Sequence, residues 1–202
     1  METIVLFADS KSIYKTLNCD VYDVERNALT CKSEMACVYH PPCRTWGRLR
    51  GLAKEHPGEH LLAVWSILRI WRYGGVLEHP AGSKLWSLMD LPLPGSGIDS
   101  KGGYSVSIDQ HWFGHVCKKN TWLYIKGVDN ASLPACPMNF NVITHCISST
   151  RSNSRLREVS KNKRSYTPVK LAEWLIEIVE LINYNNQKHV MQHKNAKTCC
   201  KT

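Results

Sequence analysis

The segment from residue 57 to residue 80, PGEHLLAVWSILRIWRYGGVLEHP, decides the fold class of this chain. Pro57-Gly58 opens the segment, and apolar residues then recur at helical spacing until Gly74-Gly75 interrupts the pattern. Val76 and Leu77 form a short apolar run that ends in polar residues, which is typical of a buried strand. The segment therefore predicts a buried helix that leads into a strand.

Three earlier apolar runs also end in chemically capable residues, at Asp9, at Asp23 and at His40-Pro41-Pro42-Cys43. Short continuous apolar runs are typical of strands in a parallel sheet that is covered on both faces. The helix of residues 57–74 joins the last two strands into a βαβ unit with an expected right-handed crossover. Ligands of such sheets bind beyond the carboxyl ends of the strands. The sequence therefore places Asp9, Asp23, Cys43 and Glu78 on one rim.

The rest of the sequence predicts two further strands and a division of the chain into four regions. Residues 104–108 and 121–125 predict two strands, which we expect to form an antiparallel pair at one end of the sheet. We expect four regions: a Rossmann-like catalytic core at 1–127, a basic loop region at 128–166, a helix at 167–184 that packs on the core, and a flexible basic tail at 185–202. Thr167-Pro168 is the expected start of that helix.

Composition excludes several classes of protein. Of the 202 residues, 43% are hydrophobic and 21% charged, which argues against disorder. The chain lacks an uninterrupted apolar run long enough for a membrane span, and its acidic start does not resemble a signal peptide. We therefore expect no membrane association and a cytoplasmic location. None of the nine cysteines forms a Cys-x-x-Cys pair, so we expect no metal site.

The net charge of +9 is unevenly distributed. Residues 151–202 carry 11 Lys and Arg against 4 Asp and Glu, whereas residues 1–150 are nearly neutral. A basic C-terminal quarter suits an anionic partner, with nucleic acid as the first candidate. The alternative is a solvated basic tail without a partner.

Cys43 and Glu78 carry the most specific chemistry. Two prolines hold Cys43 rigidly at a strand end, and Arg44 places positive charge beside the sulfur, which favours the thiolate. Glu78 lies at the end of the next predicted strand. A thiolate beside a carboxyl group can add to a substrate with general acid assistance. The alternative is that Pro41-Pro42-Cys43 is only a turn and that Glu78 only caps a helix.

Three segments within residues 36–127 resemble, in order, motifs of the cytosine-5 DNA methyltransferases. Pro41-Pro42-Cys43 is similar to the motif of the family's nucleophilic cysteine. Glu78-His79-Pro80 is similar to the Glu-Asn-Val motif, whose glutamate binds N3 of the flipped cytosine. Residues 103–127 resemble a third region, in which a basic element precedes the last strand. As a whole, the chain resembles short methyltransferase-like proteins of phages and prophages, which implies a location in a bacterial cell or a phage-infected host.

The resemblance implies a class I methyltransferase fold, with a Rossmann-like, mainly parallel sheet that contains an antiparallel strand pair. It implies an enzyme in which Cys43 adds to C6 of a cytosine and Glu78 donates to N3, with Arg44 and His79 beside them. Its cofactor would be S-adenosyl-L-methionine, bound by Asp9, Asp20, Asp23 and Pro41. Its partner would be duplex DNA with a flipped base. The phosphates would be bound by Lys118, Lys119, Arg151, Arg155, Arg157, Lys161, Lys163 and Arg164.

The chain departs from the family at the cofactor loop. The family has Phe-x-Gly-x-Gly, whereas residues 7–12 read FADSKS, and side chains there would crowd the methionine pocket. Because the sulfonium is cationic, we expect weak or absent binding if Lys11 lines the pocket and measurable binding if Lys11 points to solvent. The family's separate target-recognition domain is replaced by the loop region.

Two other functions remain open at this stage. The chain could modify a pyrimidine base with a different donor, or act on a free nucleotide. It could also be a non-catalytic DNA-binding or anti-restriction module, in which the residues of the rim are structural. No stable protein partner is expected.

Overall fold

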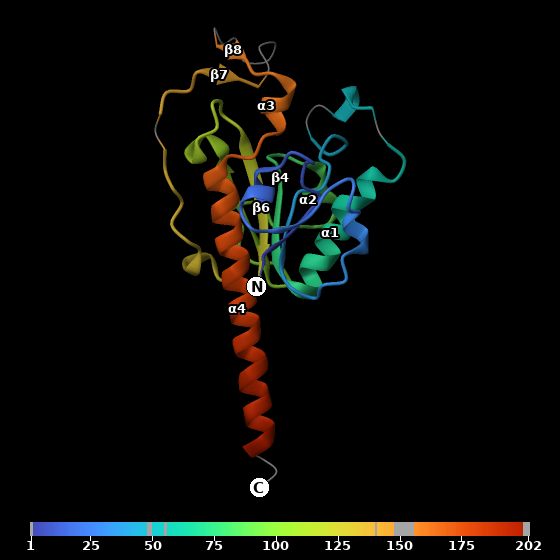
Figure 1. Ribbon diagram of the computed structural model, residues 1–202, viewed down its shortest axis with the longest axis vertical. Helices are drawn as coiled ribbons and strands as arrows, with labels where there is room; N and C mark the ends of the chain where they lie inside the picture. The colour runs from blue at the N-terminus through green and yellow to red at the C-terminus, as the bar shows by residue number, and fades with distance from the viewer. Residues whose placement is uncertain (1, 48–49, 55, 140, 148–155, 200–202) are drawn as a thin grey trace.

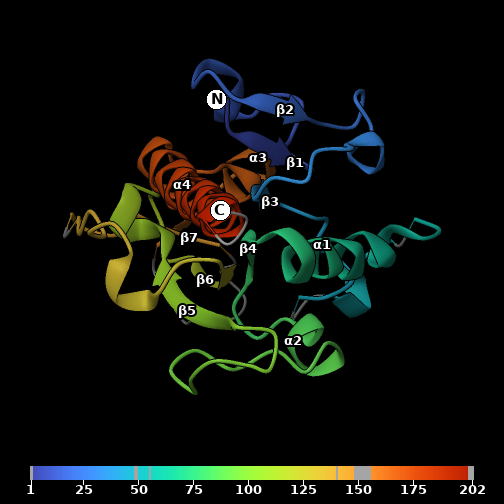
Figure 2. The same cartoon turned by 90° about the horizontal axis from the view of Figure 1, so that it is seen from below.

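A computed structural model describes residues 2–47, 50–54, 56–139, 141–147 and 156–199. Its centre is a sheet covered by α1 on one face and by α4 on the other (Figures 1 and 2). This is an α/β architecture of the Rossmann-like kind, as the sequence predicted.

The main sheet has six strands in the order β2-β1-β3-β4-β6-β5. The first four are parallel, and β6 is antiparallel to both of its neighbours. The prediction of a mainly parallel sheet with an antiparallel pair at one end is therefore confirmed. The bounds are β1 Ile4–Leu6, β2 Asp20–Tyr22, β3 Cys37–Tyr39, β4 Gly75–Pro80, β5 Gly103–Asp109 and β6 Asn120–Lys126.

Glycines set the ends of α1 (Glu59–Tyr73). Gly58 precedes the helix at φ 76°, and Gly74 follows it at φ 80° and donates its N–H to the Ile70 carbonyl. A Cβ on Gly75 would lie 2.5 Å from the Cys37 carbonyl oxygen, so only glycine lets β4 begin this close to β3. The predicted βαβ unit is therefore present, from β3 through α1 to β4.

The remaining elements are short, apart from α4. The helices are α2 Lys84–Leu88, α3 Lys161–Ser165 and α4 Val169–Cys199, and the 3-10 turns are η1 Ile13–Thr16, η2 Ala28–Thr30, η3 Arg50–Leu52, η4 Gln110–Phe113 and η5 Asn130–Ser132. A second sheet pairs β7 (His145–Cys146) with β8 (Arg157–Glu158). Figure 1 shows β7, β8 and α3 together at one end of the molecule.

Alternation along the strands divides the core into two clusters. Val38 and Val76 pack with α4, whereas Tyr39 and Leu77 pack with α1. Because successive side chains of a strand point to opposite faces, residue 78 faces α4 and residue 79 faces α1. This alternation decides which residues at the end of β4 can share a site.

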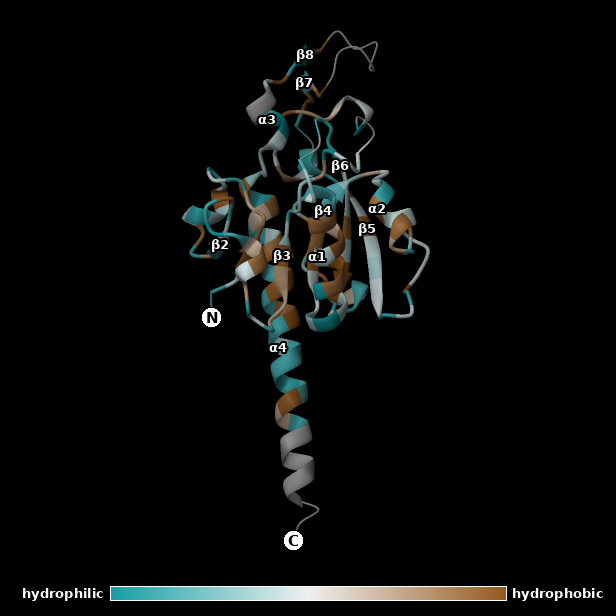
Figure 3. Cartoon of the chain, turned by 90° about the vertical axis from the view of Figure 1, so that its right-hand side faces the viewer, coloured by the Kyte–Doolittle hydropathy of each residue, from teal (hydrophilic) through white to brown (hydrophobic). Residues whose placement is uncertain are grey.

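The C-terminal helix is longer than expected. We expected it to end at residue 184, but α4 continues to Cys199 and projects beyond the sheet (Figure 3). No proline or glycine follows Val169 to interrupt the helix. In the part of the chain that the structure describes, no helix has both the length and the apolar character needed to span a membrane.

Candidate active site

The strand order marks the position of a ligand crevice. The chain runs from β1 outward to β2 and from β3 outward to β4, so the order reverses between β1 and β3. In open α/β sheets, ligands bind at this reversal, beyond the carboxyl ends of the strands. His40 follows β3 directly at this edge, and Glu78 lies in the carboxyl-terminal half of β4 next to it.

Glu78, His40 and Tyr14 form a chain of hydrogen bonds at this edge. His40 Nδ1 lies 3.1 Å from Glu78 Oε2, and His40 Nε2 lies 2.9 Å from the Tyr14 hydroxyl. Burial and the Glu78 charge raise the pKa of Tyr14 well above its ordinary value, so the phenol stays protonated. With neutral His40, Tyr14 donates to Nε2 and Nδ1–H donates to Glu78. The hydroxyl therefore fixes the tautomer that holds the carboxylate.

Gln110 holds the other oxygen of Glu78. Its side-chain nitrogen donates to Glu78 Oε1 at 3.0 Å and to Thr121 Oγ1 at 3.0 Å. Burial raises the pKa of Glu78, but the hydrogen bond from His40 and the charge of Lys119 outweigh it and lower the pKa to about 2. Glu78 is therefore ionised at neutral pH and accepts protons before it can donate one.

Cys43 lies in a tight turn, where its carbonyl accepts the N–H groups of Trp46 and Gly47. The residue is exposed, yet the surrounding protein and the Glu78 charge raise the pKa of its thiol. The charges of Lys119 and Arg44 act in the opposite direction without reversing the shift. Cys43 and Glu78 are thus close enough to interact electrostatically.

Arg44 lowers the pKa of the Cys43 thiol, as expected, but burial and the Glu78 charge outweigh it, so the pKa of the thiol is raised overall. The Arg44 Nε atom lies 3.0 Å from Glu59 Oε1 in a salt bridge. Glu59 is buried at the first turn of α1. Arg44 therefore pairs with that carboxylate while its charge also acts on the Cys43 thiol.

His79, expected beside Glu78, lies on the opposite face of the sheet. It is fully buried, hydrogen-bonds Ser83 Oγ at 2.8 Å and stacks on Trp86 at 6.4 Å between ring centroids. Burial lowers its pKa to about 4, so the ring is neutral at pH 7. His79 is therefore a core residue of the α1 side and not part of the Cys43–Glu78 site.

The acids expected to bind the cofactor have protein partners. Asp23 is buried and accepts hydrogen bonds from Lys15 Nζ at 2.5 Å and from the Glu25 and Arg26 amides, and its pKa falls to about 2, chiefly through Lys15. Asp20 opens β2, so it lies at the amino edge, away from the rim, and it pairs with Arg26. Asp9 accepts the Lys11 amide at 2.9 Å.

The loop after β1 differs from the glycine loop by which the family binds S-adenosylmethionine. Phe7 has φ 63°, in the left-handed region that glycine adopts more readily. Lys11 is exposed, as is Asp9, so the condition under which we expected measurable S-adenosylmethionine binding is the one that applies. Tyr14 is fully buried and reaches from η1 to His40, which follows β3. Pro41, the next residue in the chain, is buried as well.

The expected DNA-binding residues are only partly brought together. Lys118, Arg157 and Lys163 are exposed. Lys119 Nζ lies 3.5 Å from the Tyr166 carbonyl, and Arg164 pairs with Glu158. Lys161 begins α3. Arg151 and Arg155 lie outside the described residues.

Two histidines fasten the basic loop region to the core. His111 lies 2.6 Å from the Asn141 carbonyl oxygen, and His115 lies 3.1 Å from the Lys163 carbonyl oxygen. Their other ring nitrogens also face backbone carbonyls. Within the described ranges, no three His, Cys, Asp or Glu residues form a group able to hold a metal ion.

Sequence reasoning missed Tyr14, His40 and Gln110. His40 was visible as the polar residue that directly follows the third apolar run. Tyr14 and Gln110 carried no local signal, because they enter the site from η1 and η4 through tertiary packing. Comparison of the sequence with protein-family models and with curated proteins found no match.

Proposed function

We propose that this chain modifies a pyrimidine base by adding the Cys43 sulfur to C6 while Glu78 transfers a proton to N3. One observation carries this proposal. Glu78 is held as a carboxylate by His40 and Gln110 at the carboxyl edge of the sheet, within electrostatic range of Cys43. A cysteine beside an oriented carboxylate is the minimum set for conjugate addition to a pyrimidine.

The resting protonation states define the order of events. Glu78 begins ionised and Cys43 begins as a thiol, so the thiol proton moves to Glu78 as the sulfur attacks. The S–C6 bond forms, the C5=C6 electrons shift to C4=C5, and the C4=N3 electrons take the proton from Glu78 at N3. Glu78 is again a carboxylate, and the base is a neutral enamine whose C5 is nucleophilic. C5 then takes the electrophile, and N3 returns its proton to Glu78. The C5 hydrogen leaves as a proton to water while the Cys43 sulfur leaves C6, which restores the C5=C6 bond. Glu78 then passes its proton back to the Cys43 thiolate.

The identity of the electrophile separates two versions of the proposal. The family resemblance implies the methyl group of S-adenosylmethionine. Asp20 and Asp23, which were expected to bind that cofactor, are paired with Arg26 and Lys15, and this favours a different donor. Titration of the chain with S-adenosylmethionine by calorimetry distinguishes the versions, because only the methyl-transfer version requires this cofactor to bind.

DNA is the proposed carrier of the base. The exposed Lys118, Arg157 and Lys163 support this choice, because the region that carries them is fastened through Lys119 and His115 near the η4–β6 loop. Positive charge there would bind phosphates while a flipped base enters the rim.

Exchange of the hydrogen at C5 tests the proposal without knowledge of the donor. The enamine can take a solvent proton, so DNA labelled with tritium at cytosine C5 would release the label into water. We expect release by the wild-type chain and by Cys136→Ser, a cysteine distant in sequence from the rim. We expect none from Cys43→Ala or Glu78→Gln. Release that persists in folded Cys43→Ala contradicts the proposal, and parallel assays on deoxycytidine monophosphate identify the carrier.

A further inference from the structure

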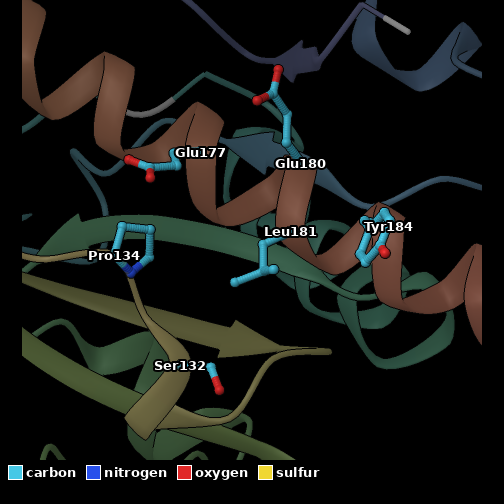
Figure 4. Close-up of a pocket in the computed structure, with 6 residues that line it drawn as sticks. All are labelled: Ser132, Pro134, Glu177, Glu180, Leu181 and Tyr184. Carbon is cyan, nitrogen blue, oxygen red and sulfur yellow. The ribbon is translucent and has the colours of Figure 1, made fainter.

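Backbone carbonyls of the basic loop region are held by side chains of α4 and η4. The Pro134 carbonyl accepts the indole N–H of Trp174 in α4 at 3.0 Å, beside an open pocket that Pro134 helps to line (Figure 4). Further along the chain, the Asn141 carbonyl oxygen lies 2.6 Å from Nε2 of His111 in η4. The indole nitrogen always carries its hydrogen, whereas His111 Nε2 is a donor only when it is protonated.

The His111 ring lies between two hydrogen-bond acceptors. Its Nδ1 lies 2.7 Å from the His115 carbonyl oxygen, and its Nε2 lies 2.6 Å from the Asn141 carbonyl oxygen. A carbonyl can only accept a hydrogen bond, and a neutral imidazole has a single N–H to donate. A neutral ring would therefore direct the lone pair of one nitrogen at a carbonyl oxygen. The imidazolium donates from both nitrogens and satisfies both contacts.

His115 provides the comparison. Its Nε2 lies 3.1 Å from the Lys163 carbonyl oxygen, and its Nδ1 accepts the Cys117 N–H at 3.2 Å and lies 3.0 Å from the Cys117 carbonyl oxygen. A neutral ring with its proton on Nε2 therefore has a partner at both nitrogens. Burial lowers the pKa of His115, which agrees with the neutral form. Among the described residues, no such donor faces either nitrogen of His111.

Asp109 is the acid in direct contact with the His111 backbone. Its Oδ1 accepts the His111 N–H at 3.0 Å and the Lys119 N–H at 2.9 Å, and the residue is buried. The other ionisable groups on the elements around His111 are the acids Glu78 and Glu173, the cations Lys118, Lys119, Lys163, Arg164 and Lys170, and the titratable groups His115, His145, Cys117, Cys136 and Cys146. The cations oppose a second proton on the ring, whereas Asp109 and the two carbonyls favour it.

We propose that His111 is a proton-dependent latch that holds residues 141–147 of the basic loop region against η4. When the ring loses a proton, one of its two contacts is lost. The Asn141 side yields, because the turn that carries the His115 carbonyl is also closed by backbone hydrogen bonds from Gly114 and His115 to η4.

The latch connects the protonation of His111 to the second sheet. Residues 145–146 form β7, which pairs with β8 and its exposed Arg157. The Thr144 and His145 amides also tie this segment to the core, but both share the Val116 carbonyl at 3.3 Å. Opening of the latch therefore loosens the support of Arg157 without unfolding the segment. This proposal does not depend on the chemistry assigned to the rim.

Nitrogen NMR of the full-length chain counts the protons on each imidazole ring, because protonated and bare ring nitrogens have well-separated chemical shifts. At about pH 7, where an ordinary histidine is mostly neutral, we expect protons on both nitrogens of His111 and on only one nitrogen of His115. His111→Phe assigns the His111 signals by their loss, and the exposed His189 supplies the reference for a ring in water. A His111 ring with a single proton under these conditions would overturn the proposal.

The methyl groups of Val142 and Ile143 report whether the segment follows the ring. Between about pH 6 and 9 their NMR shifts should change in step with the loss of the second His111 proton. His111→Phe keeps a ring but removes both contacts, so its methyl shifts should stay near the high-pH wild-type values throughout. His189→Gln is the matched control and should titrate like the wild type.

Methyl shifts that do not follow the protonation of His111 would also overturn the proposal, as would a His111→Phe chain that reproduces the wild-type titration. If His111→Phe fails to fold, the ring spectrum and the methyl titration of the wild-type chain still decide the question.

Discussion

His40 and Glu78, which are 38 residues apart in the sequence, are joined by a hydrogen bond of 3.1 Å between Nδ1 and Oε2. This bond keeps Glu78 ionised despite its burial. It also connects the carboxylate to Tyr14 in the core. The ionisation of Glu78 is therefore determined by the largely buried residues His40 and Tyr14.

Tyr14→Phe should lower the free energy of unfolding more than Tyr104→Phe does. It removes the hydroxyl from His40 Nε2 and leaves a nearly buried nitrogen without its partner, at a cost of about 1–3 kcal/mol. Tyr104→Phe is the matched control, because the buried Tyr104 hydroxyl has no partner to lose. Urea unfolding measures both variants, and equal midpoints would show that the Tyr14–His40 contact contributes nothing.

Stability should fall as the pH is lowered from about 5 toward 2. The folded pKa of Glu78 is about 2, below the unfolded value of ~4.3, so the stabilisation is complete above the unfolded pKa and lost as pH approaches the folded pKa. The contribution is at most about 3 kcal/mol. Urea midpoints should decline less steeply in Glu78→Gln than in the wild type, and parallel declines would contradict the low pKa.

Alkylation of Cys43 should depend on Glu78. Burial and then the Glu78 charge raise the pKa of the thiol, so Glu78→Gln should lower that pKa and move the alkylation profile to lower pH. Mass spectrometry of the Cys43 peptide after iodoacetamide treatment gives the rate at each pH. Glu25→Gln, at an exposed position after β2, should leave the profile unchanged. Identical profiles for all three chains would show that Glu78 does not act on the sulfur.

Duplex DNA binding should lose salt dependence when phosphate contacts are removed. Each lost contact should reduce the slope of log K against log salt by about 0.9. We expect this for alanine variants of Lys118, Arg157 and Lys163, whereas Lys32→Ala, ahead of β3 at the amino edge, should retain the full slope. An unchanged slope in all four variants would show that Lys118, Arg157 and Lys163 do not contact DNA phosphates.

Local sequence patterns were sufficient to predict the strands of the parallel sheet and the helix α1. The apolar runs and the glycines around α1 predicted the parallel strands and the βαβ unit, because burial and chain termination are encoded nearby. Period-two alternation would also have separated Glu78 from His79, since neighbouring strand residues face opposite sides of a sheet. We instead grouped the two residues by their shared motif.

Partners that depend on tertiary packing could not be predicted from the sequence. Nothing near Asp23 indicated that Lys15 would take its carboxylate, or that Glu59 would attract Arg44. The crossing of Tyr14 to His40 depends on how η1 packs beside α4 and β2. These contacts give Asp23, Arg44 and His40 protein partners that no local pattern indicated.

The central claim is that Cys43 forms a covalent bond to C6 of a pyrimidine, and covalent trapping measures this bond directly. An oligonucleotide that carries 5-azacytosine, with nitrogen in place of C5, makes C6 more electrophilic and needs no donor. After incubation and proteolysis, mass spectrometry should place the adduct on the peptide that contains Cys43, and Cys43→Ala should form none. A folded chain that forms no adduct, or one whose adduct lies on another cysteine, would contradict the account.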